Sequence, residues 1–129
     1  MKIQLADRCT GEDPEKLLES LKKIVEILEQ GGHEVYCPVL DPDRPKEKRA
    51  LFLNTMKKLE EHDAILALIK SNEKSEGMLM EIGYAMGKDK KVIAAIQEGV
   101  QTHLSVLADE VIEFRDIDDL YGKLRALKS

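Results

Sequence analysis

The sequence has few of the residues that build cofactor, metal or disulfide sites. It lacks tryptophan and has only two phenylalanines and three tyrosines among 129 residues, so the aromatic rings that stack on a flavin are scarce. Its two cysteines, Cys9 and Cys37, are too few for a disulfide framework or a four-cysteine zinc site, and we expect free thiols. The three histidines show no spacing typical of metal ligands. We therefore predict neither a metal nor a cofactor.

Long apolar runs and an excess of positive charge are also absent. No run approaches the roughly 18 to 20 residues of a membrane span, and the first residues, MKIQLADRC, turn polar too soon for a signal peptide. A net charge of -5 at pH 7 argues against a basic surface for a nucleic acid backbone. We expect one cytoplasmic domain, residues 1–129, that binds neither membranes nor nucleic acid polymers.

Short apolar runs alternate with segments of helical periodicity along the chain. We expect strands at residues 2–6, 33–38, 64–69, 91–96 and 110–114, and helices at residues 14–30, 51–61, 76–87 and 116–127. The runs AILALI and KVIAAI are apolar throughout, as is typical of central parallel strands buried on both faces. The alternation predicts an α/β fold, a three-layer Rossmann-like or flavodoxin-like domain with a parallel sheet of about five strands.

The first helix has clear boundary signals. Asp13 is a typical N-cap residue, Pro14 suits the first helical position, and Gly31 with Gly32 ends the helix. Its periodicity predicts a buried face made of Leu17, Leu18, Leu21, Ile24, Val25 and Leu28.

Ligands of such folds bind beyond the carboxyl ends of the strands, which here indicates the loops at residues 7–13, 70–77 and 97–103. The first loop matches neither the glycine-rich dinucleotide motif nor the P-loop motif. Thr10 and Gly11 are suited to approach a phosphate, although Gly11 equally fits an ordinary strand-to-helix turn.

Glu81 is the only charged residue between Gly77 and Gly87. No lysine or arginine lies one helical turn away, so the helix itself offers this carboxylate no ion pair. Burying such a group is costly unless a ligand, a partner or a raised pKa compensates, which makes Glu81 a functional candidate. A structural hydrogen bond to Tyr84 or to a neighbouring subunit is the alternative. Ser75 suits either a phosphate site or an ordinary helix cap.

The segment from Asp63 to Ile96 carries a family resemblance. It contains Asp63-Ala-Ile-Leu-Ala-Leu-Ile, a loop, and then Ser75-Glu-Gly77-Met-Leu-Met-Glu81-Ile-Gly-Tyr84-Ala, followed by a Gly-Lys turn and another apolar strand. This pattern resembles the nucleoside 2-deoxyribosyltransferase superfamily, which includes the 2'-deoxynucleoside 5'-phosphate N-hydrolases. The order of the expected strands and helices is similar along nearly the whole chain.

The resemblance implies roles for individual residues. Glu81 falls on the family's nucleophile, and Ser75 falls on the serine that binds a 5'-phosphate in the N-hydrolases, with Gly77 beside it. The first loop, with Asp7, Arg8, Thr10 and Gly11, stands where the N-hydrolases carry a Gly-Ser-x-Arg-Gly type sequence. Thr55, next to Asn54, replaces an aspartate that handles the leaving base. The resemblance also implies a homodimer.

The resulting expectation is an enzyme that cleaves the N-glycosidic bond of 2'-deoxynucleosides or their 5'-monophosphates. Glu81 would form a covalent glycosyl intermediate, held in its ionised form by backbone donors or Tyr84, and water or a second base would resolve it. Ser75 favours a phosphorylated substrate and hydrolysis. Because Thr55 cannot replace an acid, a catalytically inactive nucleotide-binding module is the alternative. A helix at residues 77–87 that serves only to bind a twin subunit is a third possibility.

Overall fold

A computed structural model of the chain describes residues 1–7 and 13–128. The strands are β1 (Lys2–Asp7), β2 (Glu34–Tyr36), β3 (Ala64–Ile69), β4 (Lys91–Gln97) and β5 (Glu110–Phe114). The helices are α1 (Pro14–Gln30), α2 (Lys48–Leu59), α3 (Glu76–Gly87), α4 (Leu104–Leu107) and α5 (Ile117–Arg125), and a 3-10 turn, η1, covers Pro38–Leu40. Among the described residues no helix is both long and apolar enough to cross a membrane.

The five strands form one parallel sheet in the order β2-β1-β3-β4-β5. Leu5 of β1 lies opposite Leu66 of β3, and Leu66 lies opposite Ile93 of β4. All three are buried, which agrees with the apolar runs predicted for central strands. The predicted α/β fold with a parallel sheet of about five strands is therefore confirmed.

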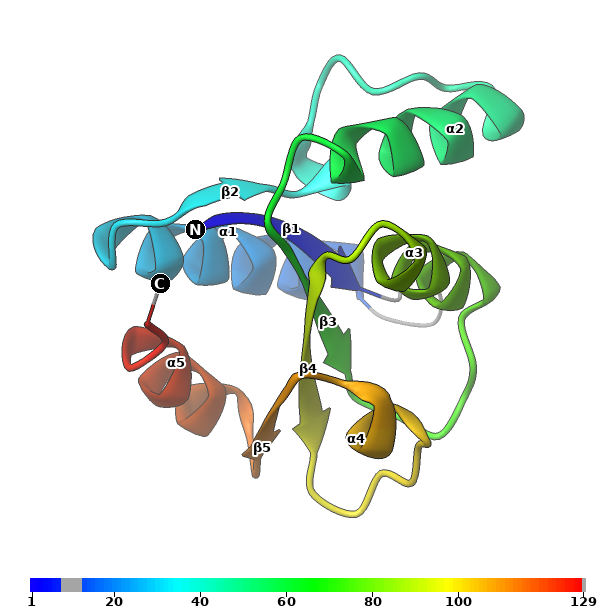
Figure 1. The fold of residues 1–129 in the computed structure, drawn as a ribbon. Helices are drawn as coiled ribbons and strands as arrows, with labels where there is room; N and C mark the ends of the chain where they lie inside the picture. The colour runs from blue at the N-terminus through cyan, green and yellow to red at the C-terminus, as the bar shows by residue number, and fades with distance from the viewer. Residues whose placement is uncertain (8–12, 129) are drawn as a thin grey trace.

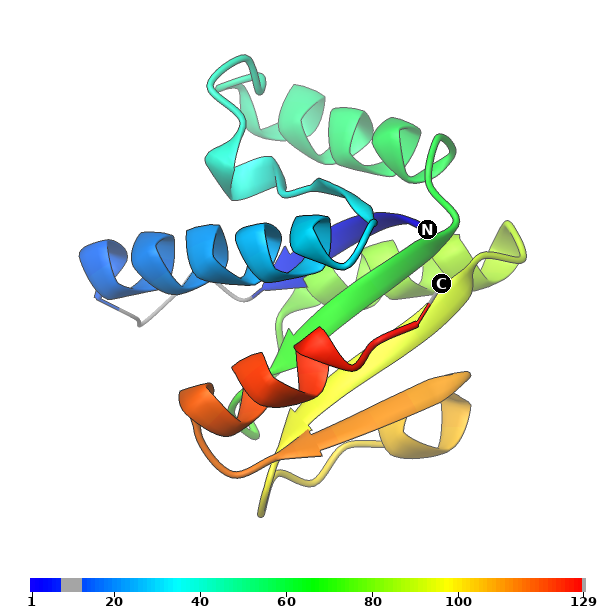
Figure 2. The ribbon, with the colours of Figure 1, turned by 90° about the vertical axis from the view of Figure 1, so that its left-hand side faces the viewer.

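Helices cover both faces of the sheet and make three layers (Figure 1). Helices α1 and α5 pack on one face, whereas α2, α3 and α4 lie over the other, as the rotated view in Figure 2 also shows. Each interface has its own apolar core: Leu21, Leu28 and Leu120 belong to the first, and Leu59 and Ile82 belong to the second. The burial of these two cores stabilises the sheet from both sides.

Several predicted boundaries differ from the structure. The second strand ends at Tyr36 instead of residue 38, because Pro38 has no N–H for a strand ladder and begins η1 instead. Helix α2 begins at Lys48, three residues before the predicted start, since the Glu47 side chain accepts a hydrogen bond from the Ala50 N–H at 2.6 Å and caps it. Helix α4 was not predicted, because its four residues are too short to show periodicity.

The predicted buried face of α1 is correct except at its edge. Leu17, Leu21 and Leu28 are buried, but Leu18 is 37% exposed and Val25 is only partly buried. Ile27 takes a place in the core instead. The buried stripe is thus rotated slightly toward residue 27, a displacement that periodicity alone does not resolve.

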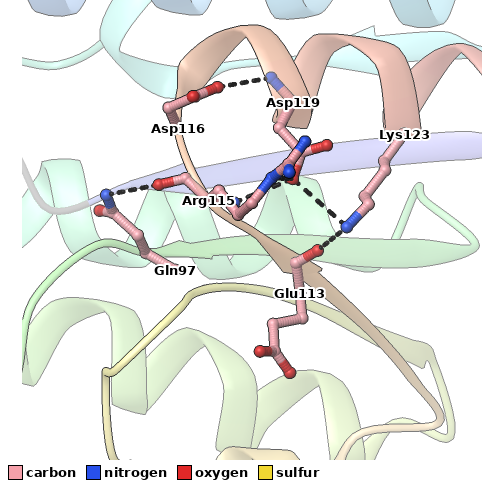
Figure 3. A network of polar contacts seen from close by, with 6 residues as sticks. All are labelled: Gln97, Glu113, Arg115, Asp116, Asp119 and Lys123. Atoms are coloured by element: carbon pink, nitrogen blue, oxygen red, sulfur yellow. Dashed lines mark hydrogen bonds and ion pairs between the residues drawn. The ribbon is translucent and has the colours of Figure 1, made fainter.

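A polar network closes the turn between β5 and α5 (Figure 3). The Asp116 side chain caps α5 by accepting from the Asp119 N–H at 2.9 Å, and the Asp119 carboxylate accepts from the Arg115 N–H at 2.9 Å. Gln97, at the end of β4, donates through Nε2 to the Arg115 carbonyl at 3.3 Å. Lys123 pairs with Asp119 and also donates to the Glu113 carbonyl. The network ties the ends of β4 and β5 to the start of α5.

The strand order determines where a ligand site is expected. β1 and β3 are neighbours, yet the helices that follow them, α1 and α3, pack on opposite faces of the sheet (Figure 1). The chain therefore diverges beyond the carboxyl ends of these two strands and leaves a crevice there.

Candidate functional site

A cleft of about 660 Å³ lies at this crevice. Its walls come from the end of β1, the segment that follows β2, one side of α2, and the first turns of α3. Among the residues predicted for the site, the structure brings together Asp7, Thr55, Ser75, Gly77 and Glu81. They come from three separate elements of the fold. The cleft is therefore a candidate active site.

Other predicted residues lie elsewhere or outside the described part of the chain. Arg8, Thr10 and Gly11 fall within residues 8–12, which the structure does not describe. The loop at residues 97–103, expected as the third ligand loop, contributes no residue to this cleft. Helix α2 and η1 occupy the corresponding wall, because the connection after the short β2 folds back over the end of β1.

Glu81 lies on the side of α3 that faces the cleft. Its Oε2 atom is buried and has no hydrogen-bond partner within the described residues. Burial raises the pKa of Glu81 from 4.5 to about 7. A desolvated carboxylate with a pKa near neutrality is the environment that active sites give to nucleophiles and bases.

The amino terminus of α3 forms one end of the cleft. Ser75 caps the helix, and its Oγ accepts a hydrogen bond from the Met78 N–H at 3.3 Å. The start of a helix carries unpaired N–H groups and partial positive charge, which favours an anion. A Cβ on Gly77 would lie 3.2 Å from Cε1 of Phe52, so glycine is what lets the Phe52 ring pack closely over this helix start.

Two basic side chains that sequence analysis did not single out also line the cleft. Arg44 follows η1, and Lys74 precedes the cap of α3. Neither side chain forms an ion pair within the part of the chain that the structure describes. Arg44 lies among many other charged residues between Asp41 and Arg49, so its sequence context gave no signal for a site. Together with the helix start, the two cations make the cleft suited to a phosphate.

Thr55 is almost fully buried and its hydrogen bonds are satisfied. Only 4% of its surface is exposed, and its Oγ1 donates to the Leu51 carbonyl at 2.9 Å. Its own carbonyl accepts a hydrogen bond from Gln4 Nε2 at 2.9 Å. The hydroxyl is thus committed to its own helix, and the side chain offers the cleft a methyl group and no acid.

Asp7 ends β1 and forms an ion pair. Its Oδ2 lies 2.9 Å from Lys70 Nζ, and only 1% of the Asp7 side chain is exposed. Lys70 follows β3, so the pair joins the two strands at the point where their helices diverge. The ion pair fixes the end of β1 beneath the cleft.

Tyr84 and Asn54 were predicted for the site, but the structure does not bring them into the cleft. The Tyr84 hydroxyl donates to Glu60 Oε1 at 2.9 Å, and this bond raises the pKa of Tyr84. Lys88 also pairs with Glu60, at 3.3 Å. This cluster draws Tyr84 toward the end of α2 and away from Glu81. Asn54 lies on another side of α2, where it lines a separate hollow with Lys57, Lys58 and Glu61.

The raised pKa of Glu81 predicts a pH-dependent effect of Glu81→Gln on stability. Below about pH 4.5 the carboxyl is protonated in both folded and unfolded chains, so the variant and the wild type should be similar. Between about pH 4.5 and pH 7 the unfolded chain ionises at Glu81 while the folded chain stays protonated, so the wild type loses stability over this range and Glu81→Gln does not. Above pH 7 we expect Glu81→Gln to be more stable by about 2–3 kcal/mol.

Urea unfolding at pH 4.5 and pH 8 measures this difference. Glu98→Gln, at an exposed acidic residue in the turn after β4, is the matched control and should show no such pH dependence. A Glu81→Gln effect of equal size at both pH values would contradict a buried, unpartnered carboxylate.

Comparisons with known proteins identify the family. The family model described as nucleoside 2-deoxyribosyltransferase matches residues 11–115. The structure of a CMP N-glycosidase from Clostridium botulinum, BcmB, is similar with a TM-score of 0.69 and 21% identity, covering 98% of this chain and 100% of that one. A 2-deoxyribosyltransferase from Bacillus psychrosaccharolyticus gives a TM-score of 0.67 and 21% identity, covering 96% of each chain. A comparison with curated protein sequences found no match.

The two structural similarities concern the fold, whereas the family model covers most of the sequence, including Ser75 and Glu81. The predicted resemblance and the prediction of an enzyme are both confirmed. The chain belongs to the nucleoside 2-deoxyribosyltransferase family, a family of enzymes that act on the glycosidic bonds of small nucleosides or nucleotides.

Proposed function

We propose that this protein cleaves the N-glycosidic bond of a 2'-deoxynucleoside 5'-monophosphate, with Glu81 as the nucleophile. The observation that carries the proposal is the unpartnered Glu81 carboxyl in the cleft between β1, α2 and α3. No described residue neutralises this carboxyl, so burying it costs stability. A substrate that bonds to the carboxylate would account for that cost.

The proposed reaction has two steps. In the first, ionised Glu81 attacks the anomeric carbon, a C–O bond to the carboxylate forms, and the C–N bond breaks with its electron pair leaving on the base. In the second, water attacks the same carbon and loses a proton, which balances the proton taken up by the departed base; Glu81 leaves as a carboxylate, and the sugar phosphate is released. A second base in place of water would give transfer instead. Without a 2'-hydroxyl the oxocarbenium-like transition state is easier to reach, which favours a deoxy substrate.

The charges around the cleft support a phosphorylated substrate. Arg44, Lys74 and the start of α3 with Ser75 lie around the same cleft as Glu81. A substrate phosphate held by them would place the attached sugar along the cleft wall that carries Glu81. The structural neighbour whose title names a CMP N-glycosidase is consistent with a nucleoside monophosphate as substrate.

A second candidate function rests on Thr55. Its buried hydroxyl is bonded within α2 and cannot donate a proton to a departing base. A protein of this fold that binds a nucleotide without cleaving it fits that observation. Binding without release of base separates this candidate from the enzyme, because a bound ligand raises the melting temperature whether or not chemistry follows.

A chromatographic assay with Glu81→Gln tests the proposed function. The wild type is incubated with the four 2'-deoxynucleosides, their 5'-monophosphates and CMP, with and without an acceptor base. We expect free base from monophosphates in preference to nucleosides, and a loss of at least about 1000-fold in Glu81→Gln because the nucleophile is removed. Glu98→Gln is the control and should retain full activity. Undiminished activity in Glu81→Gln would contradict the proposal, and ligand-induced stabilisation without release of base would favour the binding module.

The proposal includes a homodimer that packs through the outer face of α3. Leu79, Met80 and Met86 are large apolar residues on this face, and they are 42%, 46% and 41% exposed. A Cβ on Gly83 would meet nothing within 4 Å, so the glycine leaves a notch beside Met80. Antiparallel packing of two such helices would oppose their dipoles favourably and let each Met80 fill the other helix's notch.

Light scattering coupled to size exclusion tests the dimer. The wild type is expected to have the mass of two chains and Met80→Lys the mass of one, because the substitution places a charge in the apolar contact. Val106→Lys changes an apolar residue of α4 that is 83% exposed, and this control should remain dimeric. A monomeric wild type would contradict this part of the proposal.

A further inference from the structure

Two buried side-chain oxygens in the described residues have no hydrogen-bond partner; one belongs to a residue that lines the cleft and the other to a residue bonded to the cleft wall. They are Oε1 of Gln4 and Oε2 of Glu81. Gln4 is the third residue of β1 and is completely buried. Since the great majority of buried polar atoms in folded proteins are hydrogen-bonded, each of these oxygens requires a donor.

The Gln4 side chain lies on the face of the sheet that α2 and α3 cover, and α3 carries Glu81. Gln4 lies opposite Ile65 in the sheet, and Ile65 belongs to the core beneath α2 and α3. Its Nε2 donates to the Thr55 carbonyl of α2 at 2.9 Å, and Thr55 lines the same cleft as Glu81. Gln4 is thus bonded to a residue of the cleft wall, on the face of the sheet that α3 and Glu81 cover.

The bond to Thr55 also fixes which end of the Gln4 amide is free. Turning the amide over would bring its oxygen against the Thr55 carbonyl, and two acceptors repel. The donor end is thus committed to α2, and the free end of the amide is an acceptor.

The charged residues that line the cleft with Glu81 are Asp7, Arg44, Lys74 and Glu76. Asp7 is held in the ion pair at the end of β1, and Glu76 is exposed in the first turn of α3. Within the described residues, neither of the two cations forms a hydrogen bond or an ion pair with Glu81. A neutral donor is consequently the simplest partner for its buried oxygen.

We propose that Gln4 is a positioning residue for Glu81, acting through a bound water that donates one hydrogen to Gln4 Oε1 and the other to Glu81 Oε2. When Glu81 is ionised, both oxygens are acceptors and cannot bond to each other, whereas a water supplies the two donors that they need. The water would hold the carboxylate in place and favour its ionised form, which is the form that attacks. This inference rests on the proposed function of Glu81 as nucleophile, but its test does not require turnover.

The test is a carbon-13 NMR titration of the Glu81 carboxyl in wild type and Gln4→Met, with the Glu81 signal assigned by its loss in Glu81→Gln. Methionine has a similar length but cannot anchor the water. Losing one hydrogen bond to the charged form should raise the titration midpoint by about one pH unit. If the protein is active, the pH at which kcat/KM reaches half its maximum should rise by the same amount.

Gln97→Met is the matched control. Gln97 ends the strand β4 and also donates from its side chain to a backbone carbonyl, that of Arg115, but it lies outside the cleft. Its replacement should leave the Glu81 midpoint unchanged. If Gln4→Met also leaves it unchanged, Gln4 serves only to anchor α2 and the proposal is wrong.

A high-resolution crystal structure of the wild type covers the case in which Gln4→Met does not fold. A water within hydrogen-bond distance of both oxygens supports the proposal, and its absence from well-defined density overturns it. The two proposals fail in different ways. If the proposed function is wrong, no base is released from any substrate, but the titration midpoint of Glu81 still shows whether Gln4 affects its carboxyl.

Discussion

The cost of desolvating one carboxylate, that of Glu81, is the constraint around which this site is organised. Helix α3 is apolar on nearly every side after its first residue, Glu76, and its other charged residue, Glu81, faces the cleft and forms no ion pair within the described residues. Burial alone raises the pKa of Glu81 to about 7, so near neutral pH the carboxyl is poised between its two forms. A fold under selection for stability alone would place an apolar residue there, because an unpartnered buried charge opposes folding. The proposed role of Glu81 as nucleophile would account for the charge.

Helix α2 forms a wall of the cleft that Glu81 lines, so its position determines the shape of the cleft. Three independent contacts hold this helix: the Gln4 amide to the Thr55 carbonyl, the Phe52 ring over Gly77, and Glu60 with Tyr84 at the far end. Two of them join α2 to α3 and one joins it to β1. Hydrogen bonds and close packing therefore hold α2, and with it this wall of the cleft, at three points. Tyr84 helps to hold α2 against α3, and its hydroxyl donates to Glu60 instead of Glu81.

The sequence predicted the fold and the centre of the site for physical reasons. Apolar runs such as AILALI identify central parallel strands, and a charge isolated in an apolar helix identifies Glu81. It did not predict that Arg44 lines the cleft or that Tyr84 turns to Glu60, because both depend on how distant segments pack. Gln4 was missed for the same reason. A glutamine in a strand has no signal of its own, and its importance arises from the helix above it and the carboxylate beside that helix.

The central claim is that Glu81 becomes covalently bonded to the sugar. The most direct measurement is mass spectrometry of peptides from enzyme that was mixed with a 2'-deoxynucleoside monophosphate and quenched in acid within milliseconds. The account predicts a peptide containing Glu81 that is heavier by one deoxyribose phosphate residue, and no such peptide from Glu81→Gln. Release of base with no adduct on Glu81, at a rate that Glu81→Gln does not change, would contradict the account.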